Sequence, residues 1–511
     1  MSYGPALCAV LGIVFTYIVI RKRNWNARCR GLPLPPSLKG LPILGNALDV
    51  PILFNWEVYR QWGEQLGSDV VYADAFGTPI VVLNTRKAAV EILDIQSAAT
   101  SSRFSAPMAC QLMGWGYILP LAPYDADFRA KRKLFQKHFH PLDPSLYRMG
   151  ITNNLPGLLN ELLENPEGYR QANLRFIAGV IFRLAYGIHG ADEMDYYIDL
   201  TEKALATAVA ASSPGAFFVD IFPFLKYVPG WFPGAGFKRK ASEWRKLSDR
   251  FAEEPFVDSL EQMHSGRGET SFVSRAFETV YADGTGSETA RRHIKEVAAS
   301  CYAAGTETTL GTLDFFYLAM TLYPEVQVKA QKELDDYLKG ERLPNFEDEP
   351  HLPYISAIVK EVLRWQPVAP LGVPHLSTED CFYNGYFIPR GSVILANQWA
   401  MLYDEMEYPE PEIFSPERYL TQDGQICQEA PKPESIAFGF GRRVCPGAHM
   451  ATSGLFMTIA SILSVFSIGK MQDVDPVKDI RQGITRSPAE FKCEIKTRSQ
   501  NAKTWIGNLA L

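Results

Sequence analysis

The sequence predicts a mainly helical α+β fold, in which a helical body with small β-sheets follows an N-terminal membrane helix. Three observations indicate this fold. Segments with helical periodicity fill the middle of the chain, β-rich segments with turn residues lie toward both of its ends, and an uncharged stretch opens it. Elements segregated in this way are typical of α+β folds rather than of alternating βα units. A length of 511 residues allows about three domains, but the absence of a clear break after residue 46 predicts one body over residues 47–511.

Residues 1–20 predict a membrane anchor. They carry no charge and are numerous enough for one tilted span at about 1.5 Å per residue. A basic cluster follows at residues 21–23, and positive charge after the span keeps the rest of the chain cytoplasmic. A cleavable signal peptide has the opposite charge order, so it is disfavoured; a buried N-terminal helix is the other alternative. Residues 21–46 form a basic, proline-rich hinge that cannot continue the helix.

The body begins with β-structure and continues in helices. Residues 70–83 predict two short strands joined by a turn at 77–79, and β-rich sequence returns at 372–395 and after 470. Residues 265–270 and 421–435 are typical of surface loops. Helical periodicity predicts helices over residues 127–139, 155–164, 192–211, 241–262, 288–322, 324–338, 353–365 and 448–465.

Composition excludes several classes of protein. The hydrophobic share of 47% and the charged share of 21% are those of a globular protein, and they exclude disordered and multi-span chains. The net charge of −6 argues against a nucleic-acid partner. The eight cysteines include no C-x-x-C pair, which excludes common zinc and thioredoxin-type sites and favours a reducing environment. The motifs G-x-S-x-G, H-E-x-x-H and the P-loop are absent.

Residues 438–447, FGFGRRVCPG, form the strongest candidate site. Cys445 stands at the start of an apolar helical segment, where free N–H groups and the helix dipole stabilise a thiolate. Gly441 and Gly447 let the backbone approach a flat, bulky group, and Arg443 supplies charge for a carboxylate or phosphate. A lone thiolate suits a metal that another scaffold already holds, such as haem iron. The alternatives are a buried structural cysteine and a dinucleotide loop, but the latter lacks its third glycine.

This segment resembles the haem-binding signature F-x-x-G-x-R-x-C-x-G of the cytochrome P-450 family. Phe438, Gly441, Arg443, Cys445 and Gly447 occupy its five fixed positions. The resemblance implies the cytochrome P-450 fold and a haem b cofactor with Cys445 as the axial ligand of its iron. Further motifs follow in the family's order, so the resemblance covers nearly the whole chain.

Residues 304–309, AGTETT, resemble the family's oxygen-activation motif. Small Ala304 and Gly305 would leave room for a flat cofactor. The Thr308 hydroxyl can bond to the carbonyl of Ala304 and open the helix. Thr308 and Glu307 are then the catalytic residues, which relay protons to dioxygen. Taken alone, the motif is equally compatible with an ordinary polar helix segment.

Glu361 and Arg364 stand three residues apart on a predicted helix, so they share a face. Such a pair is usually a solvated surface ion pair. The resemblance instead implies a buried structural network with Arg418, which belongs to the segment PERY at residues 416–419 and supports the cysteine loop.

The resemblance also implies that Arg132, His375 and Arg443 bind the haem propionates. Residues 128–132 match the family's W-x-x-x-R, but Phe128 replaces the tryptophan and removes its indole N–H donor. For His375, a lone satisfied histidine is the alternative interpretation.

Five cations and no acid lie between residues 129 and 139, which predicts a basic helix face. In the family, the matching helix meets an acidic reductase. Because the chain contains no flavin-binding or ferredoxin-like segment, the resemblance implies electrons from NADPH through a membrane-bound NADPH–cytochrome P-450 reductase. Together with the anchor, it places the protein in the endoplasmic reticulum membrane, with the catalytic domain in the cytoplasm. The five cations are Arg129, Lys131, Arg132, Lys133 and Lys137.

The resemblance places a substrate pocket along residues 103–124, 204–233, 368–373 and 483–485, besides the long helix. These stretches are apolar and aromatic, which favours a lipophilic small molecule. Residues 222–241 resemble fungal secondary-metabolism members related to O-methylsterigmatocystin oxidoreductase, which implies hydroxylation in terpenoid or polyketide biosynthesis. The alternatives are a haem-thiolate isomerase or dehydratase without a reductase, a secreted peroxygenase, and a non-catalytic haem-binding membrane protein.

Overall fold

The computed structural model describes residues 23–51, 56–212, 215–282, 286–471, 473, 480–481, 483 and 485–509. The predicted anchor over residues 1–20 lies outside them, as do residues 21–22 of the hinge. Within the described part, one helix, Ala448–Val465, is long and apolar enough to cross a membrane, but 61% of it is buried in the protein. Such burial is that of a core helix.

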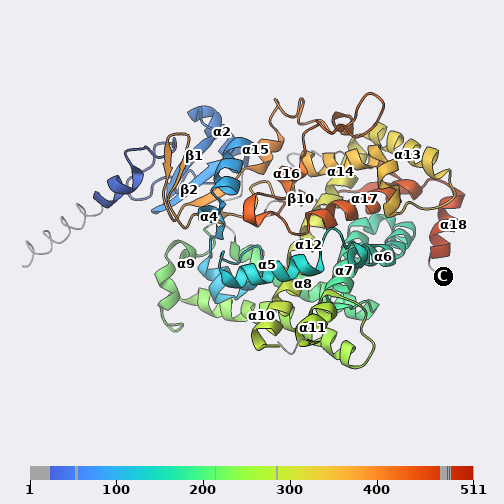
Figure 1. Cartoon of the computed structure of the whole chain (residues 1–511), viewed down its shortest axis with the longest axis horizontal. Coiled ribbons are helices and arrows are strands. Elements are labelled where there is room, and N and C mark those ends of the chain that lie inside the picture. Colours follow the sequence, from blue (N-terminus) through green and yellow to red (C-terminus); the bar gives the residue numbers. More distant parts are fainter. Residues whose placement is uncertain are drawn as a thin grey trace, which may run out of the picture.

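Helices make up most of the described chain, with small sheets, as the sequence predicts (Figure 1). The α-helices are α2 (Trp56–Leu66), α3 (Arg86–Ala89), α4 (Ser97–Thr100), α5 (Ala126–His138), α6 (Ser145–Glu164), α7 (Tyr169–Tyr186), α8 (Ala191–Ser212), α9 (Phe218–Ile221), α10 (Gly236–His264), α11 (Phe272–Ala282), α12 (Glu288–Leu322), α13 (Pro324–Leu338), α14 (Pro353–Trp365), α15 (Gln398–Leu402), α16 (Glu434–Ala437), α17 (Ala448–Val465) and α18 (Gln500–Leu509). Short π or 3-10 turns are η1 (Val90–Ile95), η2 (Pro107–Leu112), η3 (Trp115–Tyr117), η4 (Pro166–Gly168), η5 (Pro223–Tyr227), η6 (Phe346–His351), η7 (Pro416–Tyr419) and η8 (Gly441–Arg443).

The largest sheet has five strands in the order β1-β2-β7-β4-β3. Strands β1 and β2 form an antiparallel hairpin, and β2 pairs with β7 in parallel. Strand β7 pairs with β4, and β4 pairs with β3, both in antiparallel orientation. The last pairing sets Arg103 on β3 directly opposite His375 on β4. The strands are β1 (Val70–Ala75), β2 (Thr78–Leu83), β3 (Ser102–Arg103), β4 (His375–Leu376), β5 (Cys381–Tyr383), β6 (Tyr386–Ile388), β7 (Val393–Ala396), β8 (Phe466–Lys470), β9 (Ile480–Arg481), β10 (Ser487–Pro488) and β11 (Cys493–Thr497).

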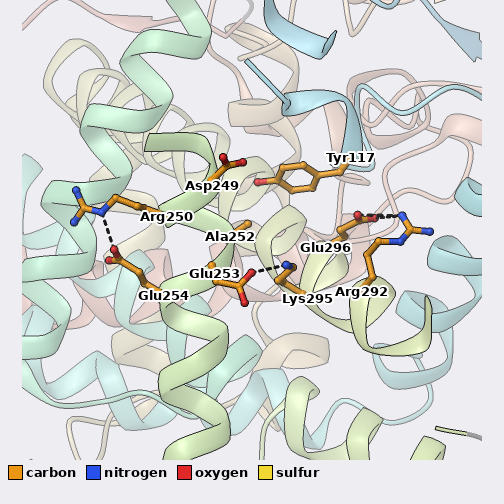
Figure 2. Close-up of a pocket in the computed structure, with 9 residues that line it drawn as sticks. All are labelled: Tyr117, Asp249, Arg250, Ala252, Glu253, Glu254, Arg292, Lys295 and Glu296. Carbon is orange, nitrogen blue, oxygen red and sulfur yellow. Dashed lines mark hydrogen bonds and ion pairs between the residues drawn. The ribbon is translucent and has the colours of Figure 1, made fainter. Parts of the chain in front are cut away.

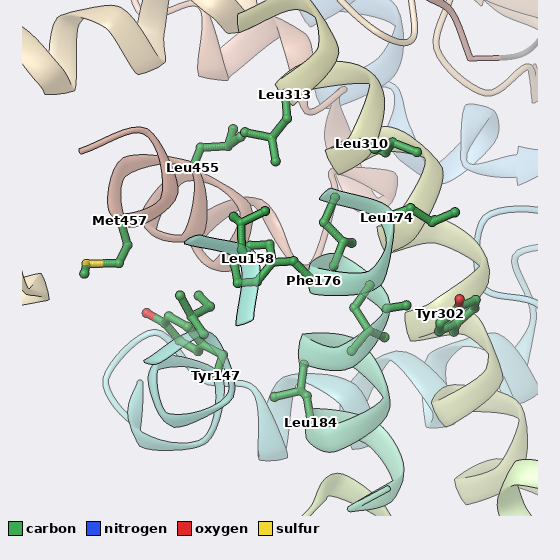
Figure 3. Close-up of a cluster of buried hydrophobic side chains, with 14 of the residues drawn as sticks. Tyr147, Leu158, Leu174, Phe176, Leu184, Tyr302, Leu310, Leu313, Leu455 and Met457 are labelled. Carbon is green, nitrogen blue, oxygen red and sulfur yellow. The ribbon is translucent and has the colours of Figure 1, made fainter. Parts of the chain in front are cut away.

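The main hydrophobic core lies where α6, α7, α12 and α17 pack together (Figure 3). Its buried side chains include Leu158 on α6, Phe176 on α7, Leu313 on α12 and Leu455 on α17. Helix α12 also contacts α5, α10, α11 and α14. The long helix is therefore held along several sides, and the residues of its central turns have fixed positions.

Four helices, α12, α13, α14 and α17, have the bounds that the sequence predicts. Four others of ten residues or more, α2, α7, α11 and α18, are not predicted by the pattern, and α18 lies where the sequence analysis expects β-rich structure. Of the 18 residues of α7, 13 are buried. A helix that is apolar on most sides shows little 3.6-residue periodicity, which explains why the pattern misses it.

Candidate active site

The cysteine loop joins α16 to α17 and is fixed by backbone contacts. The Cys445 N–H donates to the Phe438 carbonyl at 2.8 Å and closes the loop. Gly441 has a φ of +60°, and a Cβ there would lie 2.0 Å from the Leu93 carbonyl oxygen on η1. Its N–H donates to the Asp94 carboxylate. Because any side chain at Gly441 would clash with the backbone, only glycine lets the loop lie against η1.

Cys445 is an accessible thiol ahead of α17. Of the seven cysteines in the described part of the chain, it is the one classed as exposed. Although the side chain is accessible, its depth in the fold raises the pKa of the Cys445 thiol, whereas the Gly447 N–H and the charge of Arg132 lower it. Gly447 has a φ of −95°, and a Cβ there would meet no protein atom within 4 Å. Neither backbone strain nor protein packing therefore requires glycine at this position.

Three arginines and a histidine gather beside this loop. Burial lowers the pKa of Arg103 and of Arg443, the latter to about 9, and repulsion among the cations adds to the effect. Burial and these two guanidinium groups also lower the pKa of His375, so this side chain is neutral. Arg132, the third arginine, acts on both Arg443 and Cys445. The structure thus brings the predicted Arg132, His375 and Arg443 together with Cys445.

Backbone carbonyls, rather than carboxylates, hold this cluster. The buried Arg103 Nε has no hydrogen-bond partner among the described residues. A buried, unpartnered N–H among repelling cations is unfavourable by itself and fits an anionic group. The bonds run from Arg443 to Ala122 O at 2.9 Å and Leu119 O at 2.8 Å, from Arg132 to Val444 O at 2.8 Å, from Arg103 to Val373 O, and between His375 Nδ1 and Thr100 O at 2.8 Å.

Arg103 belongs to this cluster, although no sequence motif identifies it. The one feature of the sequence that could have pointed to Arg103 is that no other charged residue lies between Asp94 and Asp125. Phe128, which cannot donate a hydrogen bond, lies with its ring 4.0 Å from Arg443 Cζ. It therefore contributes by packing on the guanidinium group.

On α12, the Thr308 hydroxyl donates to the Ala304 carbonyl at 2.8 Å, as the sequence predicts. Ala304 and Glu307 are exposed although most of α12 is buried, so this turn borders open space. Burial raises the pKa of Glu307 despite this surface access. Gly305 has a different reason to be small: a Cβ there would lie 3.0 Å from the Ile181 side chain on α7. The expectation that Gly305 leaves room for the cofactor is therefore replaced by close packing of α7 on α12.

Glu361, Arg364 and Arg418 meet in a buried network. The side chains of Glu361 and Arg364 are 0% exposed, and two bonds of 2.8 Å join them. Arg418 Nε donates to Glu361 at 3.1 Å, and Tyr419 and the Ser415 N–H donate to the same carboxylate. The network joins α14 to η7. A second ion pair, Lys360–Glu434, joins α14 to α16, from which the cysteine loop starts.

The predicted basic face of α5 is smaller than its sequence indicates. Lys131 is 2% exposed and donates to Glu296 at 2.9 Å and to Asp127 at 3.0 Å. It faces α12 rather than solvent, so the prediction that it belongs to the basic face is wrong. Arg132 points to the cysteine loop. The exposed cations of α5 are Arg129, Lys133 and Lys137.

A hollow of about 500 Å³ lies between η3, α10 and α12, outside this site (Figure 2). None of its lining residues belongs to the cysteine loop or to the Ala304–Thr308 turn. Six of its charges form the pairs Arg250–Glu254, Lys295–Glu253 and Arg292–Glu296, and the seventh, Asp249, pairs with Arg245 outside the lining. No charge in it is left for a ligand, so the hollow is not a second candidate site.

The exposed Cys445 and the carboxylate-free cluster are features that fit a haem-thiolate protein. In the described residues, no group of three or more His, Cys, Asp or Glu side chains could hold a metal ion. A single sulfur donor therefore fits an iron whose macrocycle supplies the other ligands. Arg103, Arg132 and Arg443 have no carboxylate partner among the described residues, and a group with two carboxylates, such as haem, fits them.

Comparison with known proteins agrees with this class. The cytochrome P-450 family model matches residues 35–495. The chain is 41% identical to cytochrome P-450 monooxygenase ple1 of Rhodocybe pseudopiperita over 98% of this chain and 95% of that protein. It is 38% identical to monooxygenase COX2 of Coprinopsis cinerea (99% and 96%) and 36% identical to tryptamine 4-monooxygenase of Psilocybe cyanescens (93% and 94%). The chain belongs to the cytochrome P-450 family, and it is an oxidoreductase of the monooxygenase type.

Proposed function

We propose that this monooxygenase hydroxylates a lipophilic small molecule in secondary metabolism, with electrons from NADPH that arrive through a separate reductase. The observation that carries the proposal is the turn at Ala304–Thr308, where a fixed hydroxyl and an exposed carboxyl border open space. The relatives support it, since they are named as monooxygenases and one of them as acting on tryptamine.

Haem, when bound, supplies the chemistry that activates dioxygen for insertion of one oxygen atom into a C–H bond. Cys445 holds it through the thiolate. Arg103, Arg132 and Arg443 hold its carboxylates as charged donors. Neutral His375 already donates its one N–H to the Thr100 carbonyl, so it would need a second proton to donate to a carboxylate as well. Because these donors are already anchored to backbone carbonyls, they lose little conformational freedom when the carboxylates bind.

Thr308 and Glu307 hold and move the protons that the reaction consumes. The Thr308 hydrogen is directed at the Ala304 carbonyl, which leaves the lone pairs of its oxygen free to accept a hydrogen bond from the reacting side. The raised pKa of Glu307 keeps its carboxyl protonated at a higher pH than that of a free glutamate in water. Glu307 is therefore suited to replace a proton that leaves by way of Thr308.

The reductase docks on the exposed cations of α5 together with Arg442, which is exposed on the cysteine loop. Arg129 and Arg442 both lie over the Tyr124 ring, at 5.7 and 5.6 Å. An acidic partner would be steered to such a patch, and rising ionic strength would weaken it. NADPH-driven turnover that needs no added reductase would contradict this partner.

The protein is a membrane protein of the endoplasmic reticulum in this proposal. Large apolar side chains exposed near α9 and the β1–β2 turn support a membrane-facing surface, and Phe76 and Phe222 connect these two regions at 5.9 Å. Sedimentation of the full chain with vesicles, even at high salt, would test it; a chain that stays in the supernatant would contradict it. The most exposed of these side chains are Ile43, Leu48, Phe218, Phe224, Tyr227 and Trp231.

The proton function is tested with Thr308→Ala. We expect the variant to consume NADPH while product per NADPH falls severalfold and peroxide rises, because the fixed hydroxyl is lost. Thr306→Ala is the matched control: Thr306 makes the same type of bond, to Tyr302 O at 3.1 Å, but it is buried on another face. Tightly coupled turnover in Thr308→Ala, or equal uncoupling in both variants, would refute the role of Thr308.

A further inference from the structure

A buried carboxylate lies on α12 beyond the turn that carries the proposed chemistry. The Asp314 side chain is only 3% exposed, and a buried carboxylate is unfavourable unless its charge is compensated. Arg170 on α7 donates from Nε to Asp314 Oδ2 at 3.1 Å. Asp314 Oδ1 is buried and has no hydrogen-bond partner among the described residues. Arg170 therefore compensates the charge of the Asp314 carboxylate, and it binds only one of the two carboxylate oxygens.

Arg170 also acts on Glu307. Asp314 and Glu307 are seven residues apart, so they lie on one face of α12 about 10 Å from each other along its axis. Burial raises the pKa of both acids, that of Asp314 to about 6, and the charge of Arg170 opposes this for both. The two carboxylates also repel one another. The charge of the Arg170 guanidinium group thus acts on both Asp314 and Glu307.

The other titratable groups around the pair do not bond to Asp314. Arg481 on β9 lowers the pKa of both acids, and Glu202 on α8 raises that of Glu307. Burial is the main cause that raises the pKa of the remaining neighbours of Asp314, and nearby negative charge, that of Asp314 included, adds to it, so these groups stay neutral: Tyr169, Tyr317 and Cys493. Burial likewise raises the pKa of Tyr302 beside Glu307. Arg170, whose side chain is 33% exposed, is therefore the cation through which Asp314 acts.

We propose that Asp314 is a positioning residue, which anchors and neutralises Arg170 and thereby sets the pH range over which Glu307 can supply a proton. The inference rests on the proposed role of Glu307. When Asp314 is ionised, it cancels the charge of Arg170, and Glu307 retains its proton. When Asp314 is neutral, the positive field of Arg170 is unopposed and favours the ionised form of Glu307. No electron or covalent bond is involved; only the proton on the Glu307 carboxyl is affected.

The test uses the pH dependence of product formed per NADPH in the reductase-supplied holoenzyme. Asp314→Asn leaves an uncancelled cation, so the midpoint at which coupling declines with rising pH should move down by about 0.3–1 pH unit. Arg170→Gln removes the cation and should move this midpoint up, by a smaller amount, because the buried Asp314 then keeps its own proton to higher pH. The double variant carries a neutral pair and should return close to the wild-type midpoint. Lys295→Gln, which breaks the surface pair with Glu253, is the matched control and should not shift it.

A second readout needs no turnover. The infrared band of protonated carboxyl groups is titrated in the same variants, and the part that belongs to Glu307 is identified by its loss in Glu307→Gln. Opposite shifts in Asp314→Asn and Arg170→Gln support the inference, because a purely structural role would move both variants in one direction. Shifts in the same direction, or no shift, overturn it. If Glu307→Gln leaves the coupling profile unchanged, the proposed role of Glu307 fails, and the inference fails with it.

Discussion

Replacement of Glu361 by glutamine should be the most damaging single change in the support of the cysteine loop. The carboxylate is fully buried and accepts bonds from Arg364, Arg418, Tyr419 and the Ser415 N–H. Glutamine has nearly the same shape but no charge, so it leaves the buried Arg364 without compensation. Breaking a buried pair in this way costs about 3–5 kcal/mol. For a chain of this size, with an unfolding entropy of roughly 1 kcal/mol/K, the unfolding midpoint should fall by about 3–5 °C.

Thermal unfolding at one fixed scan rate measures this effect, and the carbon monoxide difference spectrum of the reduced protein reports the state of the Cys445 ligand. The matched control is Asp199→Asn, which removes an exposed pair with Lys203 on α8. Such a pair contributes about 0.3–0.5 kcal/mol, so its midpoint should move by less than about 1 °C. If Glu361→Gln unfolds within about 1 °C of the wild type with its spectrum intact, the network does not support the loop.

Two further predictions follow from the same structure. Gly441→Ala should destabilise the protein by at least about 2 kcal/mol because of its clash with Leu93 O at a positive φ. Gly447→Ala should leave the unfolding midpoint of the haem-free protein unchanged but speed the transfer of haem to apomyoglobin; an unchanged transfer rate would argue against haem at Gly447. Asp314 has a pKa raised by burial from 3.8 to about 6, so its contribution to stability is present below about pH 4 and is lost as the pH rises through 6. The difference in free energy of unfolding between Asp314→Asn and the wild type, measured by chemical denaturation, should therefore shift in favour of the variant by about 3 kcal/mol between pH 4 and pH 7. A difference that stays constant with pH would contradict the burial of Asp314.

Sequence reasoning predicts several helices from their apolar pattern, but it misses α2 and α11, whose apolar and polar residues also stand at helical spacing. The sequence predicts α12 and α14 with their observed bounds, because each has distinct apolar and polar positions at helical spacing. The sequence does not predict α7, because this helix is buried on most sides and its pattern shows little periodicity. This omission has a consequence for the site, since α7 contributes Arg170 and packs against Gly305 through Ile181.

Short motifs predict the cysteine loop and the turn on α12, but they do not predict which neighbours a charged residue meets. Lys131 and Arg132 are adjacent in sequence, yet Lys131 binds Glu296, 165 residues away, and Arg132 binds the Val444 carbonyl. No sequence motif identifies Arg103 as a site residue, because only the pairing of β3 with β4 sets it opposite His375. Partners of this kind are determined by tertiary packing, which the local pattern does not encode.

Four of the five buried cations in the described part of the chain are of two kinds, and the difference concerns function; the fifth, Arg486, bonds to the Pro367 carbonyl and the Gln366 amide. Lys131 and Arg364 each bind a carboxylate of the chain itself, so their burial is compensated in the folded protein alone. Arg103 and Arg443 bind carbonyl oxygens and repel one another, and their pKa values are lowered. Desolvation of these two groups opposes folding until an anion binds between them. A group that brings two carboxylates, as the proposed haem does, would therefore stabilise the native state beyond its contacts, and its binding would be thermodynamically linked to folding of the region around β3 and the cysteine loop.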